Sequence, residues 1–118
     1  MTITERHAGT VTVLAPAGRL TMEDAGQLKG KVSSLFNAGR KHIVLNLGDV
    51  TYIDSTGLGE IVSCHTTASR ENGAIRLASL GKRTSDLLVI TKLNMVFDVH
   101  DSESAAVASF GPSITGAA

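Results

Sequence analysis

The stretch of residues 43–62 constrains the fold more than any other part of the chain. It opens with Ile43-Val44-Leu45-Asn46-Leu47, a short apolar run typical of a buried strand. After a short acidic turn, apolar residues recur at helical spacing, at Leu58, Ile61, Val62 and Ala68. When a strand passes through a short turn directly into a helix, the first residues of the helix are exposed. Their backbone N–H groups lack partners within the helix, and the helix dipole there favours negative charge.

The predicted start of this helix combines three capping residues with two glycines. Asp54, Ser55 and Thr56 are all residue types that cap helix N-termini well, and a single one of them would be enough. Gly57 and Gly59 each lower helix propensity by about 1 kcal/mol relative to alanine. We therefore expect the glycines to allow either close backbone packing or an open surface on which a partner can sit.

The hexapeptide Asp54-Ser55-Thr56-Gly57-Leu58-Gly59, with the apolar run before it, resembles the signature of bacterial anti-sigma factor antagonists, which are STAS-domain proteins. In that family, the serine directly after the aspartate is phosphorylated by an anti-sigma factor that is itself a serine kinase. The resemblance assigns phosphorylation to Ser55. It assigns partner binding to Asp54, Ser55, Thr56, Gly57, Leu58 and Gly59. The family often has a second serine at the position of Thr56, a difference that keeps the hydroxyl group.

The resemblance implies a partner-switching regulator that is not an enzyme and needs no cofactor. Unmodified, such a protein binds an anti-sigma factor serine kinase of the GHKL type and thereby releases a sigma factor. Phosphorylation at Ser55 would inactivate it, and a phosphatase would restore it. The alternative is a STAS accessory subunit of a lipid-transport ABC complex, in which the same helix end is a permanent docking surface without phosphorylation. A serine directly after the aspartate favours the first interpretation.

Three other interpretations of Ser55 follow from the residues alone. A serine at a helix start is most often only a cap. A hydrolase nucleophile would sit in a G-x-S-x-G turn, but Ile53-Asp54 precede this serine. A phosphate-binding loop would need a further glycine and a Lys-Ser/Thr pair, which do not follow Gly57 and Gly59. The spacing therefore argues against the nucleophile and the phosphate loop.

Composition limits the remaining function classes. At 118 residues the chain is long enough for one core, and we predict a single domain over residues 1–110 with a flexible tail over 111–118. Eleven basic and eleven acidic residues cancel, which argues against direct nucleic-acid or membrane-surface binding. With a single cysteine, Cys64, no internal disulfide can form, as is usual in a reducing cytoplasm. No apolar run approaches a membrane span or a signal-peptide core, so we expect a cytoplasmic protein.

The order of predicted elements is ββαβαβαβα. After an antiparallel hairpin, strands alternate with helices, which predicts an α/β fold with parallel pairing and right-handed crossovers, a STAS-like mixed sheet. The N-terminal part is predicted to form a hairpin of Ile3–His7 and Val11–Ala15 that ends at Pro16-Ala17-Gly18. A helix follows from a capping box at Thr21 to Gly39, with Ala25, Leu28, Val32, Leu35 and Phe36 on one face. The later predicted elements are a strand at Ile43–Leu47, a helix to about Glu71, a strand at Ala74–Ala78, a short helix capped by Thr84 or Ser85, an edge strand at Met95–Val99, and a last helix through Phe110.

The other candidate residues carry weaker signals. His7, His42, His65 and His100 lack metal-ligand spacing, so no metal site is predicted. Cys64 has no charged neighbour in sequence that would activate it, and we expect it to pack in or near the core. Asp49 is expected in a turn after the strand, with orientation of a partner's nucleotide as the functional alternative. The basic pair Lys82-Arg83 is expected in a solvated loop.

Overall fold

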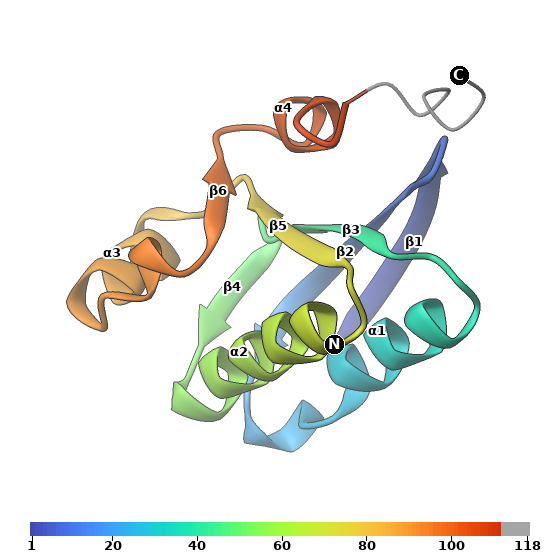
Figure 1. The fold of residues 1–118 in the computed structure, drawn as a ribbon. Coiled ribbons are helices and arrows are strands. Elements are labelled where there is room, and N and C mark those ends of the chain that lie inside the picture. The colour runs from blue at the N-terminus through green and yellow to red at the C-terminus, as the bar shows by residue number, and fades with distance from the viewer. Residues whose placement is uncertain (112–118) are drawn as a thin grey trace.

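The computed structural model describes residues 1–111, which form one mixed sheet flanked by helices (Figure 1). The strands are β1 (Thr2–Ala8), β2 (Val11–Leu20), β3 (His42–Asn46), β4 (Val50–Ile53), β5 (Ala74–Ala78) and β6 (Asp98–His100). They lie in the order β1-β2-β3-β5-β6, while β4 pairs with β2. The β1–β2 pair is antiparallel and the other pairs are parallel. The predicted mixed sheet is confirmed, with the apolar run of residues 43–47 in its centre.

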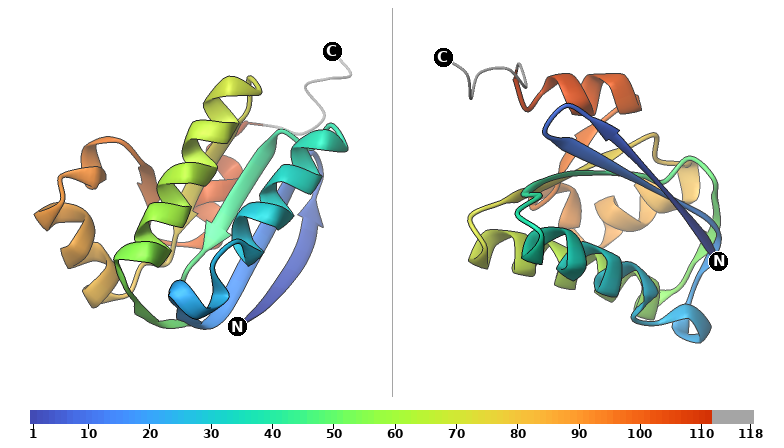
Figure 2. Two further views of the ribbon diagram at one scale, coloured as in Figure 1. Left: turned by 90° about the horizontal axis from the view of Figure 1, so that it is seen from below. Right: turned by 90° about the vertical axis from the view of Figure 1, so that its right-hand side faces the viewer.

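Helices cover the two faces of the sheet unequally. The helices are α1 (Gln27–Asn37), α2 (Ser55–Arg70), α3 (Lys82–Ile90) and α4 (Glu103–Ala108), with short 3₁₀ turns η1 (Met22–Asp24) and η2 (Leu93–Met95). Figure 2 shows α1 and α2 side by side on one face, whereas α4 lies on the opposite face. Helix α3 stands to one side, next to β4 and the start of α2 (Figure 1).

Strand β3 shows why the central run is apolar without alternation. Ile43 and Leu45 belong to the large core beneath α1 and α2. Val44 points to the other face, into a smaller core with Ala106 of α4. Because successive side chains of a strand point to opposite faces, a strand covered on both faces must be apolar throughout. All three side chains are fully buried.

The first difference from the sequence prediction is the length of β2, which continues past Pro16 to Leu20. Residues 11–14 pair with β3 and residues 18–20 pair with β4, with a register shift between Gly18 and Arg19. Pro16 lies in the interval between these two parallel partners. A proline has no N–H to donate, so it is tolerated where a strand has no neighbour on that side. The predicted strand end at Pro16-Ala17-Gly18 was therefore wrong.

The second difference is the strand β4, which the sequence interpretation placed within the acidic turn. Only Gly48 and Asp49 form the turn after β3, and the Asp49 carbonyl accepts a hydrogen bond from the Gly18 amide at 3.0 Å. Strand β4 then pairs with the far end of β2 and leads straight into α2. The element order is thus ββαββαβαβα, which adds one strand to the predicted mixed sheet.

Several helix boundaries also differ from the prediction. The capping-box segment after Thr21 forms only η1, with no capping bond from the Thr21 side chain, and Ala25 lies outside the helix and is exposed. Helix α1 begins later, after Gly26 at φ +93°. Helix α3 begins at Lys82 after Gly81, two residues before the predicted caps. The predicted edge strand is shorter, because residues 93–95 form η2.

The end of the chain was predicted as a flexible tail over residues 111–118. Residues 112–118 lie outside the described residues, so the tail and the domain boundary at residue 110 stay predictions. Just before them, Phe110 stacks on His42 with a centroid separation of 4.7 Å, and the Arg76 guanidinium lies 4.0 Å from the same ring. Up to Gly111, no helix combines the length and apolar character required to span a bilayer.

Candidate functional site

Asp54 caps helix α2, so Ser55 is not the capping residue. The Asp54 backbone is extended, and its Oδ1 accepts a hydrogen bond from the Gly57 amide at 2.8 Å. Ser55 and Thr56 are the first two helical residues, and both are exposed. Since the carboxylate of Asp54 provides the cap, the Ser55 hydroxyl is not needed for that purpose.

Asp54 also holds the chain that approaches from η1. Its second carboxylate oxygen accepts a hydrogen bond from the Met22 amide at 3.2 Å. The Gly57 amide, with smaller contributions from the amides of Met22 and Thr56, holds the pKa of Asp54 below its ordinary value. Asp54 is therefore a fixed negative charge directly before the predicted phosphorylation site.

The two glycines at the start of α2 have different structural roles. A Cβ atom on Gly57 would lie 2.1 Å from the carbonyl oxygen of Leu20, so only glycine allows α2 to approach β2 this closely. A Cβ atom on Gly59 would meet nothing within 4 Å. Both predicted possibilities therefore occur: Gly57 serves close packing, and Gly59 leaves an open surface.

The remaining residues of the signature region face inward. Leu58 is buried in the large core. Glu60, which the sequence interpretation did not single out, is also buried, although it carries a carboxylate. Its two oxygens accept hydrogen bonds from the amides of Gly26 at 3.0 Å and Lys29 at 2.8 Å. Glu60 thus satisfies the start of α1 from the neighbouring helix. An isolated sequence gives no sign of such a tertiary cap.

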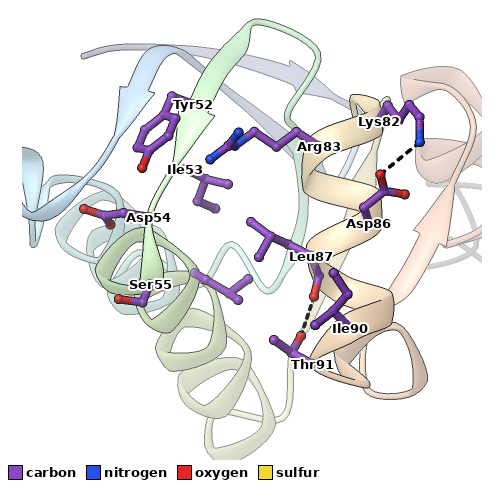
Figure 3. A pocket seen from close by; sticks show the side chains of 11 residues that line it. Tyr52, Ile53, Asp54, Ser55, Lys82, Arg83, Asp86, Leu87, Ile90 and Thr91 are labelled. Carbon is purple, nitrogen blue, oxygen red and sulfur yellow. Dashed lines mark hydrogen bonds and ion pairs between the residues drawn. The ribbon is translucent and has the colours of Figure 1, made fainter.

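A cleft of about 930 Å³ lies between the start of α2 and helix α3 (Figure 3). One wall carries Ser55 and Asp54, and the other is formed by α3. The lining residues are Tyr52, Ile53, Asp54, Ser55, Leu58, Lys82, Arg83, Asp86, Leu87, Ile90 and Thr91. The predicted site residues Asp54, Ser55 and Leu58 therefore share a cleft with residues 24 to 37 positions later in the chain.

The basic pair Lys82-Arg83 was predicted in a solvated loop, and this prediction was wrong. Both residues belong to the first turn of α3 and line the cleft. Lys82 forms an ion pair with Asp86 at 3.0 Å. The Arg83 guanidinium lies 4.6 Å from the centroid of the Tyr52 ring. The helical spacing of the apolar residues that follow did predict a helix here, but the predicted helix began two residues too late to include this pair.

The four histidines and the cysteine each contact different neighbours. His42 stacks on Phe110, and His65 meets the ring of Phe97 edge-on at 5.3 Å. His7 and His100 each contact a nearby carboxylate. Within residues 1–111, no three potential ligands group to hold a metal ion. Cys64 is fully buried as expected, and burial raises the pKa of its thiol to about 12, so it is not a reactive thiolate.

The exposed helix start at Ser55 is that expected from the resemblance, although the strand β4 precedes it in place of the predicted turn. A comparison of the whole chain agrees with the resemblance. The STAS domain family matches residues 2–106. This chain belongs to the STAS domain family. The match therefore extends far beyond the six residues of the signature.

Individual relatives agree with this assignment. A protein of Thermotoga neapolitana, named as a candidate anti-sigma factor antagonist, is 36% identical over 98 residues, covering 82% of this chain and 87% of the relative. The anti-sigma-B factor antagonist of Bacillus subtilis is 31% identical over 91 residues, covering 77% and 83%. The crystal structure of a candidate anti-sigma factor antagonist from Thermotoga maritima superposes with a TM-score of 0.85 at 30% identity, covering 91% and 92%.

Proposed function

We propose that this STAS protein is an anti-sigma factor antagonist that switches partners through Ser55. In the unmodified state it binds an anti-sigma factor that is also a serine kinase, and the bound sigma factor is released. Phosphorylation of Ser55 ends this binding, and a phosphatase reverses it. The protein is a kinase substrate and a binding partner in this scheme, and it supplies no catalytic groups.

The observation that carries the proposal is the exposed Ser55 at the first position of α2, with the cap supplied by Asp54. A kinase provides the phosphate-handling groups itself and requires from its substrate an accessible hydroxyl in a fixed place. Ser55 meets both requirements, because it is exposed and because the Asp54 cap fixes the helix start. The names of the relatives support an anti-sigma factor as the partner.

Phosphorylation would change the interface more than the fold. A phosphoserine carries about −1.5 to −2 charges at neutral pH. The start of α2 tolerates this charge, because the helix dipole favours anions there. A partner packed on Ser55 would have to desolvate the new charge beside the existing carboxylate of Asp54, which is unfavourable. The complex should therefore dissociate while the protein stays folded.

The proposal is tested by incubating the purified protein with anti-sigma factor kinases and ATP, followed by mapping of the phosphate by mass spectrometry. Ser55→Ala should abolish incorporation, and Thr56→Ala should retain it, because both hydroxyls are exposed and only the first follows the aspartate. Incorporation at Thr56, or none with any such kinase, would contradict the assignment. The second result would leave a permanent docking surface as the better description.

A charged substitution at Ser55 should change the affinity for the kinase without changing the stability of the fold. Ser55→Ala should bind the kinase as tightly as the wild type, with a free energy of unfolding unchanged within about 0.5 kcal/mol, because Ser55 is not the cap. Ser55→Asp should be equally stable but should bind more weakly, because its charge must be desolvated at the interface. Thermal melts and binding titrations on the three proteins measure both quantities. Equal binding by Ser55→Asp would count against the charge mechanism.

A further inference from the structure

The wall of the cleft opposite Ser55 carries a large apolar side chain that is highly exposed to solvent. Ile90 lies near the end of α3, lines the cleft and is 76% exposed. It is not an isolated case in this segment of the chain. Exposed large apolar side chains concentrate between residues 89 and 99, at Val89, Ile90, Met95, Val96 and Val99. Of these five side chains, Ile90 lines the cleft and the other four do not. An exposed apolar side chain beside an apolar cleft is typical of a surface that binds another protein.

Ile90 continues into an apolar floor. Leu87, one turn earlier in α3, is partly buried against the large core and lines the same cleft. From the other side, Ile53 of β4 and Leu58 of α2 complete the lining. Figure 3 shows Leu87 and Ile53 between the helix α3 and the strand that leads to Ser55. An apolar side chain from a partner would find contacts on both walls.

The lining of the cleft holds two carboxylates, Asp54 and Asp86, and two cations, Lys82 and Arg83. The guanidinium groups of Arg19 and Arg83 each lie 4.6 Å from the centroid of the Tyr52 ring. In the described part of the chain, neither arginine forms an ion pair with a carboxylate. Lys82, by contrast, is paired with Asp86. An arginine held on an aromatic ring is positioned to bind a carboxylate of a partner with little loss of side-chain freedom.

We propose that this cleft binds a segment of the anti-sigma factor that carries an apolar side chain next to a carboxylate. The apolar side chain packs on Ile90 and Leu87, and the carboxylate pairs with Arg83. Arg83, which forms no ion pair within the described residues, favours a segment that brings a carboxylate to this point. Ser55 on the facing wall makes the cleft continuous with the site that the kinase must reach. This inference rests on the proposed function, and it adds the chemistry of the partner segment.

The same arrangement accounts for release after phosphorylation. A phosphate on Ser55 would bring about two negative charges to the wall of the cleft that holds Asp54. An acidic segment of the partner would be repelled there, and the phosphate would compete with it for the positive charge of Arg83. A neutral or basic segment would not be displaced in this way.

The test uses the anti-sigma factor kinase that phosphorylates Ser55 in the experiment above. Ile90→Ser and Arg83→Gln are compared with two matched controls, Val89→Ser and Arg70→Gln. Val89 is an exposed neighbour on the same helix outside the cleft, and Arg70 is an exposed arginine at the far end of α2. Melting curves verify that all four variants fold. Kinetics of Ser55 phosphorylation give KM and kcat separately.

We expect Ile90→Ser to raise KM about tenfold and Arg83→Gln about three- to tenfold, with kcat nearly unchanged, because neither side chain takes part in phosphoryl transfer. The effect of Arg83→Gln should shrink as the salt concentration rises, since it removes an exposed charge. The controls should behave like the wild type.

Three outcomes are decisive. Unchanged KM for both cleft variants, with normal phosphorylation of Ser55, overturns this inference and leaves the proposed function intact. Equal losses for Ile90→Ser and Val89→Ser, together with concentration-dependent dimers in sedimentation, overturn it in favour of self-association through α3. If no anti-sigma factor kinase modifies Ser55, the proposed function fails and the inference falls with it.

Discussion

The first backbone amides of α1 and α2 find their hydrogen-bond acceptors in different ways. Helix α2 is capped by the residue directly before it, and its first two residues are exposed. Helix α1 follows Gly26, which has no side chain to act as a cap. Its first amides are satisfied by Glu60, which reaches across from α2. The start of α2 is thus capped by its own preceding residue, whereas the start of α1 is capped by a residue of the neighbouring helix.

This difference shows which helix start can change without disturbing the fold. A group added at Ser55 touches the surface of a start that is already capped from within. A change at the start of α1 would disturb a buried carboxylate and the packing of two helices. The protein therefore carries its proposed modification at the helix start whose cap comes from the residue directly before it.

The largest effect should come from Gly57→Ala, which tests whether the α2 start is fixed by its contact with β2. The new methyl group would overlap the carbonyl oxygen of Leu20, at 2.1 Å, and backbone cannot move aside easily. Overpacking of this kind costs about 1–3 kcal/mol or more, well above the gain in helix propensity. Urea unfolding measures the change. Wild-type stability would show that α2 can shift away from β2 without loss.

The next largest effect should come from Glu60→Gln, which weakens the borrowed cap of α1. An amide offers one acceptor oxygen where the carboxylate offers two, so one of the two backbone amides, that of Gly26 or that of Lys29, loses its partner. We expect a loss of about 1–3 kcal/mol in the free energy of unfolding. The buried thiol of Cys64, one turn further along α2, reports local opening through its rate of labelling. Equal labelling rates in variant and wild type would show that the cap is dispensable.

A smaller effect of opposite sign is expected for Gly59→Ala. A Cβ atom at this position meets nothing within 4 Å, and alanine is the better helix former. The variant should gain about 0.5–1 kcal/mol in the free energy of unfolding. Together with Gly57→Ala, it separates the packing glycine from the surface glycine. A loss of stability in the same urea titration would mean that the open surface at Gly59 is in contact with another part of the protein.

The smallest effect at neutral pH is expected for Asp54→Asn, because asparagine also caps helices well. The pH dependence should differ more. The pKa of Asp54 is lowered in the folded protein, so its charge stabilises the fold fully above the ordinary value of 3.8. This contribution is lost as the pH falls through the lowered value. The stability difference between wild type and Asp54→Asn should therefore decrease on acidification below pH 3.8, as measured by urea titrations at several pH values.

The sequence predicted those parts of the structure that depend on local patterns. The apolar run at residues 43–47 and the capping residues before Gly57 were sufficient to place the central strand and the start of α2. Strand β4 was missed because its four residues, Val50–Ile53, merge with the turn and the signature. Their strand character depends on pairing with the end of β2.

The opposite wall of the candidate site was missed for a similar reason. Arg83 gains a role only because α3 lies against β4 and the start of α2, which no local pattern of the sequence reveals. Glu60 likewise looks like an ordinary helical acid until α1 is packed beside it. The roles of Arg83 and Glu60, whose partners are distant in sequence, were therefore not predicted. Asp54, whose capping partner Gly57 is three positions away, was among the predicted capping residues.

The double pairing of β2 has a consequence for how the chain reaches its native state. Residues 11–14 pair with β3 and residues 18–20 pair with β4, while β1 pairs with residues 11–17 on the other side. Of these pairings, only the β1–β2 hairpin joins strands that are close in sequence, whereas β3 and β4 meet β2 across more than 30 residues of chain. Because closing a short loop costs the least entropy, the hairpin is the pairing that forms most easily. We expect a folding transition state in which the β1–β2 hairpin is already formed and the parallel pairings of β5 and β6 are not. Rapid-mixing kinetics on core variants should then give φ-values that are high in β2 and low in the last two strands.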